Sequence, residues 1–386
     1  MDQVLARLSR RTSSGRFIPE IDGLRFVAIA LVVLLHVGQV LSPNLRLDRP
    51  FGTIDPSVRI PAILAPGWFG VELFFVISGF ILALPFAAWR RAGARPVNLR
   101  GYYLRRLTRL EPPYVLALAL SFAAAAALSP VRVLLPHLLA SLIYQHRSVF
   151  GYDSNLNVPF WSLEIEVQFY LLVLLLAVLF RIDDTGRRRI AMAAVGLLAA
   201  LVGSVVRWDT GTVLSYLVFF LAGFVLADVY VSDWAEQPVP RAAWDLITLV
   251  GWPVLFLLAG TTHSGRLTVI APWLIVGLYM AAFRGPLTRR VLRNRWLTTI
   301  GGMCYSIYLL HYPLMLLIAR ALHPASALAW AGSAVALVAA TLAAGVTFFA
   351  LVERPCMEPH WPSKLIARLR TRAEGEPVRV PVTEPP

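Results

Sequence analysis

Long apolar runs separated by short basic connections dominate this chain. The runs that are long enough to cross a bilayer as helices lie at 23–41, 67–88, 112–128, 161–180, 190–206, 212–230, 244–260, 267–283, 300–319 and 328–351. This pattern predicts an all-α, polytopic membrane bundle of about ten transmembrane helices. The stretch 129–160 contains LLPHLLASLIY, which is too short to span, so we expect an amphipathic or re-entrant helix and a polar loop there.

The basic residues in the connections predict the orientation of the bundle. Arginines cluster before the first run, between the second and third, between the fourth and fifth, and after the eighth and tenth. By the positive-inside rule these connections are cytoplasmic, so both termini are expected to be cytoplasmic as well. The predicted plan is a basic N-terminus at 1–17, a transmembrane domain at 18–355, and a basic, partly disordered tail at 356–386 that contains SKLIARLRTR.

Composition supports a membrane protein and excludes several other classes. Of the 386 residues, 58% are hydrophobic and 15% are charged, whereas about a quarter of the residues in a soluble domain are charged. The net charge of +14 is spread over the connections, so nucleic-acid binding is not expected. Cys304 and Cys356 support neither a disulfide framework nor a metal site. No cleavable signal is expected, and we predict a multi-pass protein of a bacterial inner membrane.

The first apolar run carries an ionisable pair. It opens with Asp22-Gly23-Leu24-Arg25, and His36 follows Arg25 by eleven residues. At 100° per residue both side chains lie on one helix face, about 16 Å apart along the axis. Ionisable residues inside a membrane are costly and usually functional. The alternative is that Arg25 snorkels to the cytoplasmic surface and His36 is an ordinary core histidine.

Three other apolar runs place polar or aromatic side chains at a similar depth in the membrane. These residues are Glu72, Ser78, Trp161, Ser162, Glu164, Glu166, Tyr305 and His311. A carboxylate beside a histidine fixes its tautomer and raises its basicity, which suits the deprotonation of a hydroxyl group. We therefore expect Glu166 or Glu72 to orient His36, and the set indicates acyl transfer onto an alcohol. Taken singly, each residue is equally well explained by solvation at the interface or by a hydrogen bond between helices.

Residues 99–114, LRGYYLRRLTRLEPPY, form a basic and aromatic stretch on the predicted cytoplasmic side. Arg105 and Arg109 lie on one helix face, with Tyr102 and Tyr103 nearby. Guanidinium groups bind phosphates through paired hydrogen bonds, and the aromatic rings could stack on a base. The alternative is that these arginines only anchor the helix ends.

Five motifs together resemble those of the membrane-bound acyltransferase family 3. They are IDGLRFVAIALVVLLH, GVELFFVISGFIL, YLRRLTRLEPPY, PFWSLEIEVQFYLL and YSIYLLHYPL, and they occur in the family's order across residues 18–355. Members of this family O-acylate carbohydrates and related acceptors. The resemblance implies an acyl-coenzyme A donor, usually acetyl-coenzyme A, and a carbohydrate or glycosylated acceptor that arrives from the other side of the membrane.

The resemblance also implies roles for individual residues. Arg25 and His36 correspond to the family's essential pair, and Glu166 corresponds to the carboxylate that follows Trp-Ser-Leu. The implied donor-binding surface comprises Arg106 and Arg109, to which we add Arg105 and Tyr114. The chain departs from the family pattern at two positions. Val167 stands where a second acidic residue is common, and Phe26 replaces a small residue beside Arg25.

These assignments lead to a mechanistic hypothesis and to competitors. The nucleotide end of coenzyme A is expected to bind at the basic stretch, and its pantetheine arm is expected to pass near Arg25. His36 is expected to act as a general base or as a transient acyl carrier, and no metal is expected. The competing hypothesis is a proton-coupled transporter or flippase of a polar solute or lipid-linked glycan. A structural scaffold does not explain charges aligned inside apolar helices. Side chains in and beside the outer loops suit either sugar recognition or a membrane interface: Trp68, Tyr144, Tyr152, Asp153, Asn155 and Asn157.

Overall fold

The computed structural model describes residues 8, 10, 17–42, 61–205, 212–261, 265–322, 324, 326–358 and 361–362. In this part of the chain all regular structure is helical, as the apolar runs predict. The elements are α2 (Pro19–Val40), η1 (Ala65–Trp68), α3 (Phe69–Arg91), α4 (Leu99–Ala126), α5 (Val131–Leu142), α6 (His146–Phe150), η2 (Val158–Phe160), α7 (Trp161–Leu176), η3 (Ala177–Arg181), α8 (Thr185–Val205), α9 (Val213–Ser232), α10 (Ala243–Thr261), α11 (Gly265–Arg284), α12 (Pro286–Leu292), α13 (Arg295–Gly302), α14 (Cys304–Ala319), α15 (Ala327–Phe348), η4 (Phe349–Glu353) and α16 (Arg354–Cys356).

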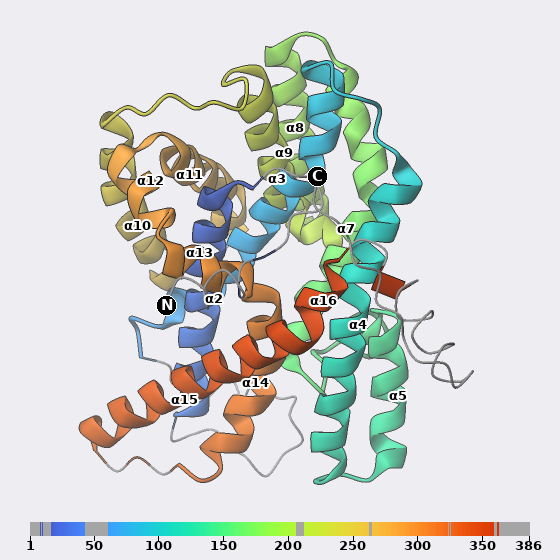
Figure 1. Ribbon diagram of the computed structural model, residues 1–386, viewed down its shortest axis with the longest axis vertical. Helices are drawn as coiled ribbons and strands as arrows, with labels where there is room; N and C mark the ends of the chain where they lie inside the picture. The colour runs from blue at the N-terminus through green and yellow to red at the C-terminus, as the bar shows by residue number, and fades with distance from the viewer. Residues whose placement is uncertain are drawn as a thin grey trace, which may run out of the picture.

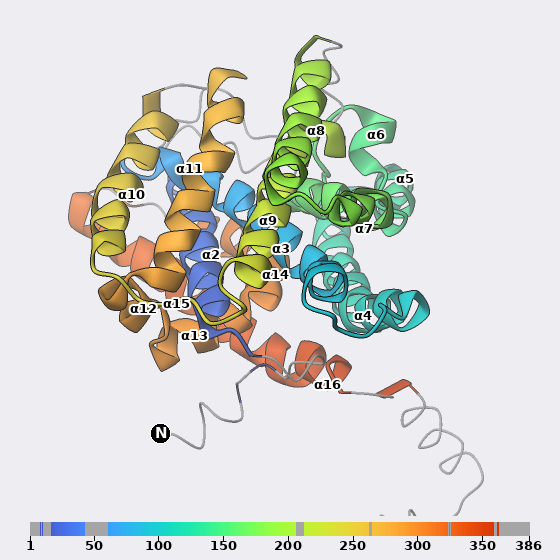
Figure 2. The same ribbon diagram turned by 90° about the horizontal axis from the view of Figure 1, so that it is seen from above.

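Helices α2, α3, α9 and α14 form the centre of the molecule (Figures 1 and 2). Helices α10 to α13 lie on one side of this centre and α4 to α7 on the other, while α15 crosses the bundle obliquely in Figure 1. The backbones of α3 and α9 approach closely because two glycines face each other. A Cβ atom at Gly223 would lie 2.8 Å from the carbonyl carbon of Gly79, so a larger residue there would separate the two helices.

The number of membrane spans differs from the sequence-based expectation. Among the described residues, five helices are long and apolar enough to cross a membrane, or up to seven if each bent helix pair counts as one span. The ten predicted spans are therefore not confirmed, and the cytoplasmic location of the termini stays a prediction. Two helix pairs are bent, by 88° between α11 and α12 and by 67° between α13 and α14, and the second bend lies inside the predicted run 300–319. The run at 112–128 is the second half of α4, whose first half is the basic stretch.

The short helix expected within 129–160 is present as α5. Its buried face carries Leu134, His137 and Ser141, at helical spacing, while Val133 and Leu139 on other faces are exposed. The short helix α6 and an irregular segment then lead into η2 and α7. The predicted amphipathic segment SKLIARLRTR and most of residues 1–17 and 42–66 lie outside the described residues.

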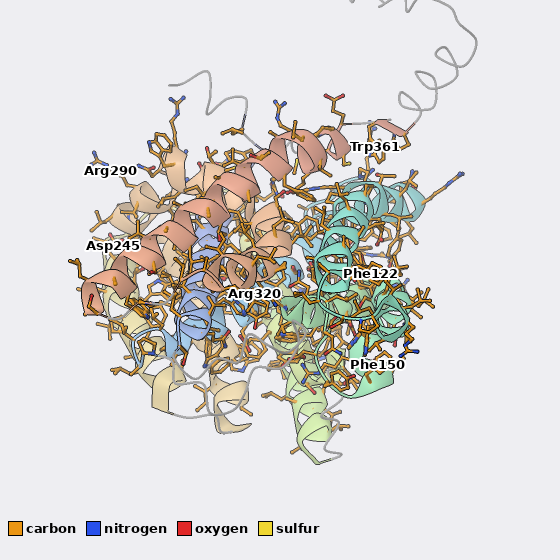
Figure 3. All side chains as sticks on the ribbon, turned by 90° about the horizontal axis from the view of Figure 1, so that it is seen from below. Phe122, Phe150, Asp245, Arg290, Arg320 and Trp361 are labelled. Atoms are coloured by element: carbon orange, nitrogen blue, oxygen red, sulfur yellow. The ribbon has the colours of Figure 1, made fainter. Side chains whose placement is uncertain are left out.

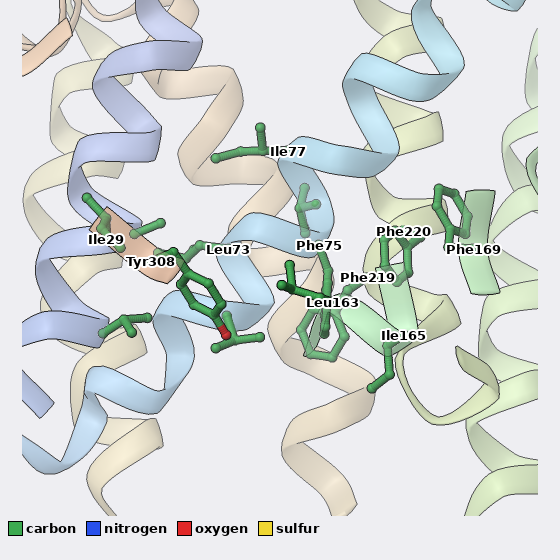
Figure 4. Close-up of a cluster of buried hydrophobic side chains, with 14 of the residues drawn as sticks. Ile29, Leu73, Phe75, Ile77, Leu163, Ile165, Phe169, Phe219, Phe220 and Tyr308 are labelled. Carbon is green, nitrogen blue, oxygen red and sulfur yellow. The ribbon is translucent and has the colours of Figure 1, made fainter. Parts of the chain in front are cut away.

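An aromatic core joins α3, α7 and α9 (Figure 4). The rings of Phe169 and Phe220 stack with centroids 3.9 Å apart, and Phe75 packs against Phe220 at 4.8 Å. Such pairs add to the stabilisation that comes from burial itself. The contact fixes α7 against α3, and this sets the register in which polar residues of the two helices meet.

Two prolines inside helices help to dock distant segments. Proline has no N–H group, so the carbonyl four residues earlier loses its helical partner. Pro313 exposes the Leu309 carbonyl in this way, and Asn157 Nδ2 donates to it at 2.9 Å. Pro112 likewise exposes the Thr108 carbonyl, which accepts from Trp361 Nε1 at 3.0 Å. In Figure 3 Trp361 and Phe150 of α6 lie well apart, on opposite sides of the α4–α7 half.

Candidate active site

His36 lies in α2 with its imidazole ring against α14. Its Nδ1 is 2.9 Å from the Val32 carbonyl oxygen and 3.1 Å from His311 Nε2. His311 is fully buried, and its own Nδ1 is 2.8 Å from the Tyr308 carbonyl oxygen. The two imidazole rings have centroids 4.9 Å apart. The structure therefore brings together two histidines that are 275 residues apart in the sequence.

These contacts fix the tautomer of each histidine. Carbonyl oxygens only accept hydrogen bonds, so Nδ1 of His36 and Nδ1 of His311 must each carry a proton. The His36 N–H group is consequently shared between the Val32 carbonyl and the lone pair of His311 Nε2. The remaining nitrogen, His36 Nε2, keeps an unprotonated lone pair and has no hydrogen-bond partner among the described residues. An imidazole in this state can take a proton from a hydroxyl group.

The expectation that a carboxylate orients His36 is wrong for the described residues. Glu166 Oε1 instead accepts from Ser78 Oγ at 2.8 Å and from Tyr170 OH at 2.7 Å. Ser78 faces α7, whereas Glu72 lies six residues earlier and about 120° around α3. Glu72 is buried, and its Oε2 atom has no hydrogen-bond partner. A backbone carbonyl and a second histidine hold His36, and the sequence pattern did not predict this arrangement.

Arg25 lies near the start of α2, one turn after Asp22. Its Nη1 donates to Asp22 Oδ1 at 2.6 Å, and this is its only hydrogen bond to the described residues. Asp22 also faces Arg10, with Nε and Oδ2 3.7 Å apart. Burial and the neighbouring Arg25 lower the pKa of Arg10 to about 9, which shows how crowded with positive charge this corner is.

The basic stretch is one continuous part of α4. Arg105 is exposed, while Arg106 and Arg109 are half-buried. Arg106 lies over the rings of Tyr102 and Tyr170, at 4.9 and 5.4 Å from their centroids. The Nε atoms of Arg106 and Arg109 are buried without a hydrogen-bond partner. Unpaired buried donors are costly, so this surface is suited to an anionic ligand.

Tyr114 does not belong to this surface. It is almost completely buried, and its hydroxyl group donates to the Ser141 carbonyl at 2.7 Å. Its ring stacks on Tyr144 with centroids 4.4 Å apart. Tyr114 therefore fastens α5 to α4, and the structure separates it from the arginines with which it was grouped.

Sequence reasoning missed Glu353, which is fully buried beside Arg109. Its Oε1 lies 3.6 Å from Arg109 Nη2, and its Oε2 accepts from Ser306 Oγ at 2.6 Å. The signal was a single carboxylate at the end of the last apolar run. Tyr305, in the same turn of α14 as Ser306, donates to the Leu110 carbonyl at 3.0 Å. The start of α14 is therefore tied to α4 and to the C-terminal helices.

The N-terminal turn of α7 meets α14 through hydroxyl groups. Tyr308 OH donates to the Pro159 carbonyl at 2.7 Å, and Ser162 Oγ lies 2.6 Å from the same hydroxyl oxygen. The Tyr308 hydroxyl group points into the space beside α3 in Figure 4. Glu164 turns elsewhere and accepts from the backbone N–H of Arg147 at 3.0 Å. In the part of the chain that the structure describes, no cluster of metal-ligating side chains occurs.

The site thus has two polar centres along the bundle interior. One contains His36, His311, Tyr308 and Ser162, and the other contains Glu166, Ser78 and Tyr170, with Arg106 of α4 over the Tyr170 ring. A family model described as an acyltransferase domain matches residues 18–350. The chain belongs to this acyltransferase family. The family that the motifs resembled is confirmed.

Known relatives of this acyltransferase come from bacteria. The peptidoglycan O-acetyltransferase OatA of Listeria monocytogenes is 24% identical over 377 residues, which cover 89% of this chain and 56% of the relative. The O-acetyltransferase OatA of Staphylococcus aureus is 25% identical over 345 residues, covering 79% of this chain and 52% of the relative. The acyltransferase chain thus spans about half the length of these curated relatives. No solved structure matches it.

Proposed function

We propose that the protein is a membrane-embedded O-acyltransferase that moves an acyl group, in particular acetyl, from acyl-coenzyme A to a hydroxyl group of a carbohydrate. The observation that carries the proposal is the geometry of His36. Its Nδ1 atom contacts the Val32 carbonyl and His311, which leaves the lone pair of Nε2 open. Family membership supplies the reaction class. The names of the bacterial relatives support acetyl as the group transferred, and their organisms favour a bacterial membrane as the location.

In the proposed reaction His36 Nε2 takes the proton of the acceptor hydroxyl group. The oxygen attacks the carbonyl carbon of the thioester, the carbon–sulfur bond breaks, and His36 returns the proton to the departing thiolate. In a two-step variant Nε2 itself attacks the thioester carbonyl carbon, the carbon–sulfur bond breaks, and the thiolate leaves. The acceptor oxygen then attacks the acyl carbon, the carbon–nitrogen bond breaks, and the hydroxyl proton passes to the thiolate. The hydrogen bonds at Nδ1 keep the ring oriented in either case.

The proposed donor path runs from α4 to α2. The buried, unpartnered Nε atoms of Arg106 and Arg109 support phosphate binding there. Arg25, which uses one of its five donors on Asp22, would hold polar groups of the pantetheine arm. Arg25 and His36 are separated by about 16 Å along the helix. An extended pantetheine arm can cover this distance, so the nucleotide and the thioester would occupy the two polar centres.

The test is the release of coenzyme A thiol by the purified protein in vesicles. Acetyl-coenzyme A is supplied with and without a soluble β-1,4-linked N-acetylglucosamine oligosaccharide, chosen because one relative is named a peptidoglycan O-acetyltransferase. We expect His36→Gln to reduce transfer by at least about 100-fold, the usual contribution of a general base. Mass spectrometry of the sugar confirms that the released acetyl group has moved to it.

A second buried histidine provides the control. His137 also pairs with a histidine, since its Nδ1 lies 2.9 Å from His146 Nε2, but its other nitrogen accepts from Asn155 Nδ2 at 3.3 Å. His137→Gln should therefore reduce transfer by less than tenfold. Full transfer by folded His36→Gln would overturn the mechanism. His36-dependent proton movement without thiol release would favour the transporter or flippase.

A further inference from the structure

The segment between α5 and α7 carries an ion pair that the proposed acyl transfer does not use. Arg147 Nη1 and Asp153 Oδ1 are 3.0 Å apart, and their side chains are 22% and 34% exposed. The Arg147 guanidinium lies 5.5 Å from the centroid of the half-buried Trp161 ring. A carboxylate, a guanidinium and a flat aromatic ring are thus fixed together at the start of α7.

This ion pair is not needed to dock the segment. The backbone N–H of Arg147 is already held by Glu164, a carboxylate that is 2% exposed. At the other end, Asn157 is fully buried and donates to the Leu309 carbonyl of α14. Both anchors are independent of the Arg147 and Asp153 side chains. Those side chains are therefore available for another role.

The ion pair is linked to the candidate base through α7 and α14. Trp161, beside Arg147, precedes Ser162, whose Oγ lies 2.6 Å from the Tyr308 hydroxyl oxygen. The rings of Tyr308 and His311 have centroids 5.6 Å apart. One turn further along α14, the ring of Tyr312 meets the His36 ring edge-on, with centroids 4.9 Å apart and a 67° angle between planes. No described residue forms a hydrogen bond with the Tyr312 hydroxyl group. A series of contacts thus leads from the partly exposed segment to the two histidines.

We propose that Asp153, Trp161 and Tyr312 form the acceptor subsite and that it takes an uncharged, hydroxyl-rich pyranose. This inference rests on the proposed function and names the acceptor chemistry for it. A carboxylate accepts hydrogen bonds from sugar hydroxyl groups, and the Tyr312 hydroxyl can both donate and accept. The half-buried Trp161 ring, which Arg147 and the Tyr216 ring flank at 5.5 Å, contributes apolar surface to the subsite. Because Arg147 balances Asp153, the group presents no net charge for a phosphate.

The subsite predicts which kinetic constant changes. With acetyl-coenzyme A and the β-1,4-linked N-acetylglucosamine oligosaccharide, Asp153→Asn should raise the acceptor KM about tenfold, as expected for the loss of hydrogen bonds to a charged group. The effect on the donor KM should be much smaller. Tyr312→Phe removes one hydroxyl group and should raise the acceptor KM about threefold. The matched control is Asp183→Asn, because Asp183 also pairs with an arginine, Arg91, at 3.1 Å, but is 95% exposed elsewhere.

A binding measurement separates this inference from the acyl transfer. Saturation-transfer NMR with the protein in nanodiscs should show contact with the same oligosaccharide, weakened by Asp153→Asn and unaffected by Asp183→Asn. Asp153-dependent binding without any acetylation would support the subsite while contradicting the proposed function. An acceptor KM within twofold of the parent, or equal rises in donor and acceptor KM, would overturn the subsite. Failure of the parent protein both to bind and to acetylate the oligosaccharide would overturn the acceptor class.

Discussion

Two deeply placed arginines, Arg188 and Arg25, use their hydrogen-bond donors in opposite ways. The side chain of Arg188 is 1% exposed, and its N–H groups meet two carboxylate oxygens of Asp228, the carbonyls of Ile182 and Asp183, and the hydroxyl of Thr185. All five donors of the guanidinium group are thereby used. Asp228 is itself fully buried and accepts from Arg189 as well.

Arg25 makes far fewer contacts. Its side chain is 15% exposed, and it donates to Asp22 alone among the described residues. The neighbouring carboxylate atom Asp22 Oδ2 is buried and has no hydrogen-bond partner. A charged cluster that satisfies itself stabilises the fold, whereas one that leaves donors and acceptors unused is prepared for a ligand. By this criterion the α8–α9 cluster is structural and the cluster at the start of α2 is functional.

The two buried histidine pairs repeat this contrast. In the pair of His137 and His146, Asn155 donates to His137 Nε2 and His137 Nδ1–H donates to His146 Nε2, so both lone pairs are occupied. In the pair of His36 and His311, the lone pair of His36 Nε2 has no donor among the described residues. The second pair can therefore take up a proton from a substrate, and the first can do so only by breaking its own contacts.

The largest effect is expected on stability, from Arg188→Ala. The substitution leaves Asp228 buried beside a partly exposed Arg189 and should lower the free energy of unfolding by about 3–5 kcal/mol. Thermal unfolding in detergent, read by size-exclusion chromatography after heating, measures this loss. The matched control is Arg187→Ala, since that side chain is exposed and adjacent in sequence. If both variants melted together, the structural role of the α8–α9 cluster would be refuted.

The next largest effect is expected on catalysis, from Arg25→Ala. If Arg25 binds the donor, loss of its charged hydrogen bonds should reduce kcat/KM for acetyl-coenzyme A by roughly 30–100-fold, or about 2–3 kcal/mol. The melting temperature should change far less than in Arg188→Ala, because Arg25 contributes one hydrogen bond to the fold. Steady-state thiol release beside the same melting assay tests both statements. An Arg25→Ala protein that is unstable but fully active per folded molecule would reverse the assignment of the two clusters.

The sequence alone predicts which segments are helical and which residues carry charge into them. Helices α2, α3, α7, α9 and α14 coincide with apolar runs, and the motifs located Arg25, His36 and Glu166. The bend between α13 and α14 was not predictable from hydrophobicity, because the apolar pattern continues through Gly301 and Gly302. Hydrophobicity reports burial, and it does not report the direction in which a helix continues.

The hydrogen-bond partners of the site residues were the least predictable feature. His36 and Glu166 were both expected in the site, but the partners expected for them were wrong: His36 meets His311 and Glu166 meets Ser78. Such pairs depend on the rotation of each helix about its axis, which the packing of rings such as Phe169 on Phe220 determines. A depth estimate along each helix cannot supply that rotation. A single carboxylate such as Glu353, which stands between Val352 and Arg354 in the sequence, is hidden for the same reason.

The smallest effect is expected from a change of pH at the pair of His137 and His146, which we call the closed histidine pair because both of its lone pairs are occupied. Burial and the neighbouring His137 lower the pKa of His146 to about 4, from about 6.5 in an unfolded chain. The folded state therefore favours neutral His146. Its stability contribution is present above about pH 6.5 and is lost as the pH falls toward 4. Between pH 7 and 5.5 the free energy of unfolding of this region should fall by about 1 kcal/mol.

Hydrogen exchange of residues 131–157 measured at these two pH values tests the expectation. The protection factors, which correct for the pH dependence of the intrinsic exchange rate, should fall there more than in α9, which contains no histidine. In the variant His146→Gln, which cannot take up a proton, this additional loss of protection should disappear. An equal loss of protection in the parent and in His146→Gln would show that another group controls the segment. Because the closed pair has both lone pairs occupied, protonation must break a contact, and its pH dependence should therefore appear in the stability of this segment.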